Sequence, residues 1–338
     1  MKRFVLRTLL YLMPFAALLL YYLVGADHGA MQGDLGRMTS TEFHYLKPHL
    51  VAPMAECRNV EKVAEIPPLA EDEMVVFGDS FSIGDSNRWH QYMGSAMGRR
   101  IVYAGRFYKP VEDLIDALNH HPAALGNLVV LELVERNLVS LALVEPLPQS
   151  KDVDLAAPVF AQPSPQKQQS AFRMIKDKWR RKSRKPLQFY QHMLGIDVPV
   201  NTATLDTEMF SCRPNKLYYY QDDLYSNLSS EQCSAALRNL KCIDSIAGAK
   251  GIAFYLVAIP DKYTVYHRHI KDAVKQERFL ESPCPFDTLP FFINTLPVME
   301  DLNRQGIMDV YLPDDSHFSH PTACAVGNYA ASRITLQP

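Results

Sequence analysis

The chain has 338 residues, and its formal net charge at pH 7 is −2. A chain of this length can bury a full hydrophobic core, in one large domain or in two modest ones. The near balance of charges gives no overall electrostatic reason to expect a nucleic-acid partner.

The first segment predicts a membrane anchor. Lys2, Arg3 and Arg7 precede an apolar run that reaches Val24, and the segment from Phe4 to Val24 has 21 residues. A helix of that length crosses the roughly 30 Å of a bilayer core, and the basic end favours the cytoplasmic side. We expect residues 1–26 to be a single-pass signal-anchor in the bacterial inner membrane, with the rest of the chain periplasmic. The small residues that end the run leave a cleaved signal peptide as the alternative.

Residues 27–70 contain several prolines and no clear periodicity, so we interpret them as a stalk or linker. The periplasm permits disulfides, and an even number of cysteines suits pairing, although sequence does not give the connectivity. No CxxC motif occurs, which argues against a zinc or redox motif. The six cysteines are Cys57, Cys212, Cys233, Cys242, Cys284 and Cys324.

From residue 71 to residue 338, short apolar runs alternate with amphipathic stretches. This alternation predicts an α/β domain with a parallel sheet. The predicted strands are 74–77, 101–103, 128–134, 252–259 and 310–312, and the predicted helices are 87–98, 111–119, 230–248, 292–305 and 321–333.

An insertion at about 140–225 interrupts the alternation. It begins with a stretch rich in Pro, Gln and Ser, which is typical of a loop or linker. A basic tract with interspersed aromatic residues follows at 176–195. This tract is either a landing surface for an anionic polymer or lipid headgroups, or the solvated face of a helix.

Reaction-capable groups follow the predicted strands. The first strand ends in "VVFGDSFS", which places Ser80 on a tight turn, and the last is followed by "PDDSHFSH". In open α/β sheets, ligands bind beyond the carboxyl ends of the strands. Ser80 is therefore a candidate nucleophile, with capping of the next helix as the alternative. His317 is the candidate base, and Asp314 or Asp315 would orient it.

An acyl reaction also needs donors for the developing negative charge on oxygen. The backbone N–H groups of Ser80 and Gly105 are candidates, because Gly105 follows the second strand. The side chain of Asn137 or of Arg136, after the third strand, is the candidate third donor.

The sequence does not predict a metal site or a cofactor. The histidines have no zinc-protease spacing, and no glycine-rich phosphate loop follows any strand.

The GDSFS block, the glycine after the second strand and the C-terminal Asp-x-x-His resemble the SGNH/GDSL hydrolase superfamily. The resemblance covers roughly residues 72–135 and 230–335, and it implies a flavodoxin-like α/β/α sandwich with ester chemistry at Ser80 and His317. Ser80, Gly105 and His317 match three of the superfamily's four marker residues. The Gly-x-Asn block is absent, since the sequence after the third strand is "ELVERN".

Two segments look like those of the periplasmic alginate O-acetyltransferase family. "VAIPDKYTVYHRHI" is similar to its Pro-x-Lys segment, which implies that Lys262 lines the site. "VYLPDDSHFS" is similar to its Asp-x-His-Trp block, although the order of the blocks along the chain differs. That block implies Asp315 as the partner of His317, whereas typical SGNH spacing implies Asp314. We favour Asp314 and keep both.

These features predict a membrane-anchored periplasmic serine acyl-ester enzyme. The leading interpretation is an O-acetyltransferase that passes an acyl group from Ser80 to a cell-surface or exported polysaccharide, with an integral-membrane acyl donor protein as partner. An esterase or deacetylase, in which water is the acceptor, is the first alternative. A non-catalytic scaffold that binds glycan or assembles an export complex is the second.

Overall fold

The computed structural model describes residues 8, 12–16, 54–60, 62–66, 69–83, 88–106, 108–143, 200–211, 213–220, 223, 229–271, 280, 285–313 and 315–334. Most of the predicted anchor at 4–24 lies outside these residues. In the part of the chain that the structure describes, no helix combines the length and apolar character needed to cross a membrane.

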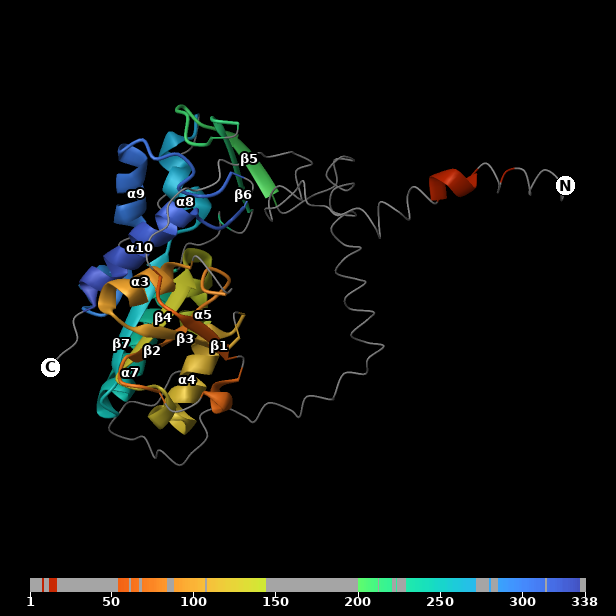
Figure 1. The fold of residues 1–338 in the computed structure, drawn as a ribbon. Helices are drawn as coiled ribbons and strands as arrows, with labels where there is room; N and C mark the ends of the chain where they lie inside the picture. The colour runs from red at the N-terminus through yellow and green to blue at the C-terminus, as the bar shows by residue number, and fades with distance from the viewer. Residues whose placement is uncertain are drawn as a thin grey trace.

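A six-stranded parallel sheet forms the centre of an α/β fold, as predicted (Figure 1). The strand order is β1-β3-β2-β4-β7-β8, and every neighbouring pair is parallel. Without β1, this is the 2-1-3-4-5 order that is consistent with a flavodoxin-like fold. The strands are β1 (Cys57–Val60), β2 (Glu73–Phe77), β3 (Arg100–Ala104), β4 (Leu128–Val134), β7 (Ala253–Ile259) and β8 (Phe292–Asn294).

The central strands form from nearly unbroken apolar sequence, because helices cover both faces of the sheet. All residues of β2 and β4 are buried. The register pairs Leu128 with Ala253 and Val134 with Ile259, so that β4 and β7 begin and end together. Loops that follow these strands therefore leave the sheet at the same edge.

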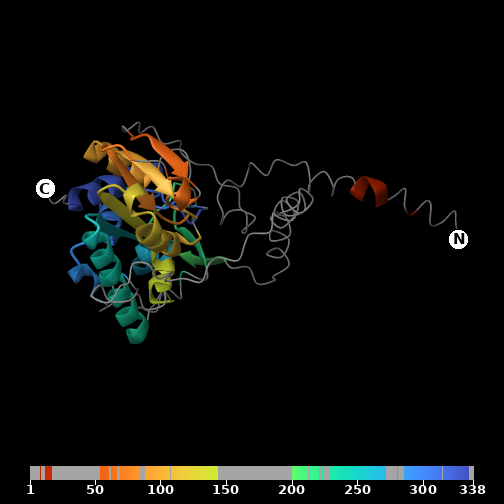
Figure 2. The ribbon, with the colours of Figure 1, turned by 90° about the horizontal axis from the view of Figure 1, so that it is seen from below.

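Two groups of helices enclose the sheet (Figures 1 and 2). In one group, α10 packs against both α3 and α9; in the other, α7 packs against α4 and α5. The helices are α3 (Trp89–Met97), α4 (Pro110–His120), α5 (Val139–Leu143), α7 (Ser230–Ala249), α8 (Lys262–Tyr266), α9 (Leu296–Arg304) and α10 (His320–Arg333). Short 3-10 turns are η1 (Val63–Glu65), η2 (Pro122–Ala124), η3 (Glu135–Leu138), η5 (His267–His269) and η7 (Phe286–Thr288).

Local sequence explains where the long helices begin. Pro110 occupies the first turn of α4, where a missing N–H costs no helix hydrogen bond. Ser229 and Gln232 form a capping box at the start of α7. These signals agree with the predicted starts at 111 and 230 to within a residue.

Two predictions, one of a domain boundary and one of a strand, are wrong. The predicted stalk at 27–70 contains β1, which pairs with β3, so the folded domain already includes Cys57–Val60. The predicted strand at 310–312 makes only an isolated bridge between Tyr311 and Phe318, and the sixth strand of the sheet is β8 instead. At three residues, β8 is too short to separate by pattern from the helix that follows it.

The structure describes part of the insertion predicted at 140–225. The strands β5 (Val200–Thr204) and β6 (Lys216–Tyr220) form an antiparallel pair. The Tyr219 ring of β6 packs against Tyr263 of α8, with ring centroids 4.8 Å apart. Residues 144–199, which include the basic tract, lie outside the described residues.

Among the cysteines, Cys233 is disulfide-bonded, and its partner lies outside the described residues. Cys57, Cys242 and Cys324 are in the thiol form and not in a disulfide.

Candidate active site

Ser80 lies on a tight turn at the carboxyl end of β2. The turn is closed by a hydrogen bond from the Ser82 N–H to the Asp79 carbonyl, at 3.1 Å. The Asp79 carboxylate accepts the Phe81 N–H at 3.1 Å and the Val134 N–H at 2.9 Å, which joins the turn to the end of β4. Asp79, Phe81 and Ser82 are buried, whereas Ser80 is partly exposed. The turn thus presents the serine at the edge of the sheet.

A buried glutamate on the neighbouring strand β4 supports this turn. Glu132, in the middle of β4, accepts the Asp79 N–H at 3.1 Å and the Ser82 hydroxyl at 2.8 Å. The Trp89 indole N–H in turn donates to the Ser82 hydroxyl at 3.1 Å. A Cβ at Gly78 would overlap the side chains of Ser82 and Glu132, so the turn needs glycine there.

The pKa of Glu132 is raised well above its usual range. Burial is the main cause, and the neighbouring charge of Asp79 adds to it. The neutral, protonated carboxyl is therefore favoured at this position.

The serine and histidine from opposite ends of the sequence meet at this edge. The Ser80 Oγ lies 3.0 Å from the His317 Nε2, and the His317 Nδ1 lies 2.6 Å from the Asp315 Oδ1. The Phe81 ring packs against the imidazole with centroids 4.6 Å apart. The arrangement has the hydrogen-bond connectivity of a serine–histidine–aspartate triad.

Asp315, not the favoured Asp314, is the partner of His317 in the structure; Asp314 itself lies outside the described residues. The same Asp315 Oδ1 also accepts the backbone N–H of His317 at 2.9 Å. An aspartate reaches the backbone two residues ahead in this way, which explains the two-residue spacing. Burial works to raise the pKa of Asp315, but its bonds to His317 outweigh this and lower it, so that the carboxylate stays ionised.

Two donors remain near Ser80 for a developing oxyanion. The N–H of Ser80 has no acceptor among the residues that the structure describes. The Asn137 amide donates one hydrogen to the Asp79 carboxylate at 2.8 Å, which fixes the side chain beside the turn. The amide nitrogen carries a second hydrogen, which can serve an oxyanion. Asn137 therefore remains a candidate donor despite the absent Gly-x-Asn block.

The prediction that Gly105 is an oxyanion donor is wrong. Its N–H donates to the Val60 carbonyl at 2.9 Å and so continues the pairing of β1 with β3. Its φ of 86° and its close approach to Asp113 give a structural reason for glycine at this place. The strand that uses this N–H was not foreseen from the sequence.

The Arg136 guanidinium is also engaged elsewhere than at the oxyanion position. Its guanidinium pairs with Asp261 and, at 3.3 Å, with Asp223, and it lies over the ring of Tyr220. Burial works to lower the pKa of Arg136, but the two carboxylates raise it overall. Arg136 thus joins β4 and β7 to the β5–β6 pair.

Lys262 does not line the site as the resemblance implies, because the residue is only 1% exposed. Its ammonium donates to backbone carbonyls of the loop that carries Asp315. Neither this contact nor the role of Glu132 was predicted. The single acid in the apolar run "LVVLELV" was the one signal in the sequence for Glu132.

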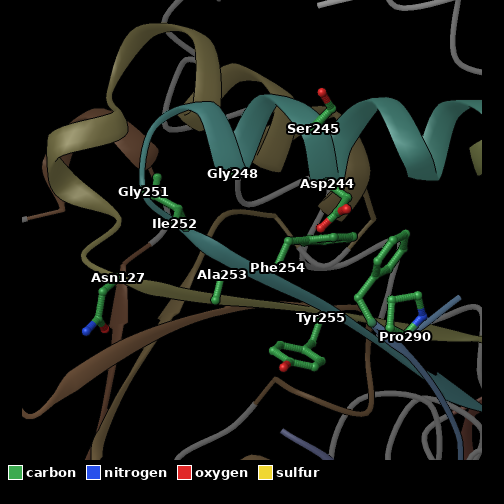
Figure 3. A pocket seen from close by; sticks show the side chains of 11 residues that line it. Asn127, Asp244, Ser245, Gly248, Gly251, Ile252, Ala253, Phe254, Tyr255 and Pro290 are labelled. Carbon is green, nitrogen blue, oxygen red and sulfur yellow. The ribbon is translucent and has the colours of Figure 1, made fainter. Parts of the chain in front are cut away.

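A cavity of about 760 Å³ lies at the other edge of the sheet (Figure 3). It opens where α7 ends and β7 begins, and its lining includes Asp244, Phe254 and Pro290. The triad lies beyond the carboxyl ends of the strands, so this cavity is separate from it. Within the described residues, no group of three or more His, Cys, Asp or Glu side chains could hold a metal ion.

No family model, curated protein or solved structure matches this chain.

Proposed function

We propose that this protein is a serine acyl-ester enzyme that forms a covalent ester on Ser80. The observation that carries the proposal is the continuous hydrogen-bonded path from the Ser80 Oγ through His317 to Asp315. A serine hydroxyl becomes an effective nucleophile when an oriented imidazole can take its proton. The SGNH-like flavodoxin-type architecture belongs to the same proposal.

In the first half of the reaction, the Ser80 Oγ attacks the acyl carbonyl and the His317 Nε2 takes its proton. Negative charge then develops on the carbonyl oxygen, facing the Ser80 N–H and the Asn137 amide. Collapse of this intermediate breaks the ester bond, and His317 gives its proton to the departing group. Asp315 stabilises the imidazolium throughout and fixes its tautomer.

In the second half, the same imidazole takes a proton from the acceptor hydroxyl. The acceptor oxygen attacks the acyl-Ser80 carbonyl, and the serine leaves with the proton from His317. We propose that the acceptor is a sugar hydroxyl of a cell-surface or exported polysaccharide and that the acyl group is acetyl. An integral-membrane protein would supply that acyl group to an enzyme anchored through residues 4–24.

The disulfide at Cys233 supports a periplasmic location, because disulfides persist in oxidising compartments. The basic tract at 176–195 would suit an acidic polysaccharide, and it belongs to the proposal on sequence grounds alone.

Hydrolysis is the second candidate function. The His317 side chain is 25% exposed, so water can approach the imidazole that would activate it. An esterase or deacetylase shares the acyl-Ser80 step and differs only in the acceptor. A non-catalytic scaffold remains the third candidate, and it predicts that Ser80 does not react at all.

The experiment offers a chromogenic acetyl ester with and without an acetyl-free acidic oligosaccharide. Transfer predicts that the oligosaccharide gains acetyl groups and that the Ser80→Ala variant transfers none. Free acetate alone, at any acceptor concentration, would favour hydrolysis. Wild-type protein that neither cleaves the ester nor reacts with a fluorophosphonate would contradict both enzymatic functions.

A further inference from the structure

A buried ammonium group lies inside the loop that carries the acid and the imidazole of the triad. Lys262 is the first residue of α8, directly beyond the carboxyl end of β7. Its Nζ lies 2.6 Å from the Leu312 carbonyl oxygen, 2.9 Å from that of Pro313 and 3.1 Å from that of Asp315. An ammonium has three N–H donors, so these three carbonyls can use all of them.

The loop closes around this ammonium. Tyr311 and Phe318 form a bridge at its base, and the Leu312 N–H donates to the His317 carbonyl at 3.0 Å. The Phe210 ring lies 5.2 Å from the Nζ and covers another side of it. The bond to the Pro313 carbonyl is buried and the other two are partly buried, so water can only partly replace the ammonium as their donor.

The two ends of Asp315 connect the ammonium to the triad. The Asp315 backbone carbonyl accepts a hydrogen bond from the Lys262 ammonium. The Asp315 carboxylate forms hydrogen bonds with both the backbone N–H and the Nδ1 of His317. The place of the Lys262 ammonium therefore fixes where Asp315 lies and, through it, how the imidazole faces Ser80.

We propose that Lys262 is a positioning residue: its ammonium holds the Leu312–Asp315 loop so that His317 stays within hydrogen-bond distance of Ser80. The Lys262 ammonium binds backbone carbonyls rather than the Ser80 hydroxyl or the His317 imidazole, so it acts through Asp315. The expected fall in kcat rests on the proposed function, whereas the expected change in hydrogen exchange of the loop does not.

The test replaces Lys262 with alanine, which removes three methylenes and the ammonium, and then adds n-propylammonium ion. We expect kcat for a chromogenic acetyl ester to fall about 100-fold, since a small misplacement of a catalytic group has an effect of that size. KM should change less than about 3-fold, because ground-state binding is untouched. Added n-propylammonium should restore kcat, whereas 1-propanol, without the charge, and tetramethylammonium, without N–H donors, should not.

Lys241→Ala is the matched control, because Lys241 is an exposed lysine on α7. It should keep the wild-type kcat and should not respond to n-propylammonium. If Lys262→Ala does not fold, Lys262→Arg takes its place. Arginine keeps the charge, but its planar fork cannot direct three donors to one point, so kcat should still fall.

Hydrogen exchange of residues 311–318 provides a measurement that needs no activity. Exchange should be faster in the Lys262 variant and should slow again when n-propylammonium is added. A wild-type protein without esterase activity would contradict the proposed function and leave this prediction standing. Wild-type kcat and wild-type exchange in the Lys262 variants would overturn the positioning role.

Discussion

The turn that carries Ser80 and the loop that carries His317 are both held from inside by a buried ionisable side chain, but of opposite kinds. Glu132 accepts an N–H and a hydroxyl of the serine turn. Lys262 donates to three carbonyls of the histidine loop. The tight turn directs an N–H and a hydroxyl inward and needs an acceptor, whereas the wider loop directs carbonyls inward and needs a donor. The polar groups that each segment turns inward thus explain why an acidic residue, Glu132, supports one and a basic residue, Lys262, supports the other.

The comparison is tested most strongly at the acid of the triad. Asp315→Asn should lower kcat about 10³- to 10⁴-fold, because an amide can hold the imidazole in the wrong tautomer. Asp314→Asn should lower kcat less than about 10-fold, since the Asp315 carboxylate already binds the His317 Nδ1. Steady-state kinetics with a chromogenic acetyl ester measure both. The reverse order of effects would move the orienting role to Asp314.

The next largest effect is expected at the edge of the serine turn. Asn137→Ala should lower kcat about 10²- to 10³-fold, which is typical for the loss of one oxyanion donor. KM should change little, because the lost interaction forms in the transition state. The same kinetic assay separates the two parameters. A rise in KM with unchanged kcat would instead place Asn137 in substrate binding.

The acid beneath the serine turn is expected to affect stability. Glu132→Leu leaves the Asp79 N–H and the Ser82 hydroxyl without their acceptor, at a cost of about 1–3 kcal/mol for each group. Glu132→Gln keeps a neutral acceptor and should cost less. Denaturant unfolding measures the difference between the two variants. Equal losses in both would mean that the negative charge, not the acceptor, supports the turn.

The raised pKa of Glu132 also predicts how stability depends on pH. The ordinary pKa of a glutamate is about 4.5, and above that pH the unfolded chain releases the Glu132 proton while the folded protein keeps it. The contribution of Glu132 to the free energy of unfolding therefore falls as the pH rises from about 4.5 towards the pKa of Glu132 in the folded protein. Glu132→Gln removes that contribution. Its stability relative to the wild type should therefore improve as pH rises, and a difference that does not vary with pH would contradict a raised pKa.

The smallest effect is expected at the glycine that the sequence wrongly favoured. Gly105→Ala forces alanine to a φ of 86°, which should lower the free energy of unfolding by about 1–2 kcal/mol. The kcat should stay within about 3-fold of the wild type, because the Gly105 N–H belongs to the sheet. Thermal melts and ester kinetics on the same sample test both. A large loss of kcat without loss of stability would return Gly105 to the oxyanion site.

The sequence predicted those parts of the site that depend on local pattern. An apolar run that ends in Gly-Asp-Ser predicts a strand, a turn and an exposed serine, and the structure has the strand, the turn and a partly exposed Ser80. The β1 strand, Cys57–Val60, was missed because it is short and half exposed, without an apolar run. That one omission also caused the error at Gly105, whose N–H is used by β1.

Contacts between distant segments could not be read from pattern. Lys262 and the carbonyls it binds are about fifty residues apart in the chain, and nothing in the local sequence distinguishes a buried loop lysine from a solvated one. The choice between Asp314 and Asp315 likewise depends on the curvature of one turn, because the two acids are adjacent.

The most direct test of the central claim is the mass of the peptide that contains Ser80. The protein is mixed with a chromogenic acetyl ester, quenched in acid and digested. The serine mechanism predicts that this peptide gains the mass of one acetyl group, and that neither Ser80→Ala nor His317→Ala gains it. Turnover of the ester with no acetyl group at Ser80, or with the acetyl group on another residue, would contradict the mechanism.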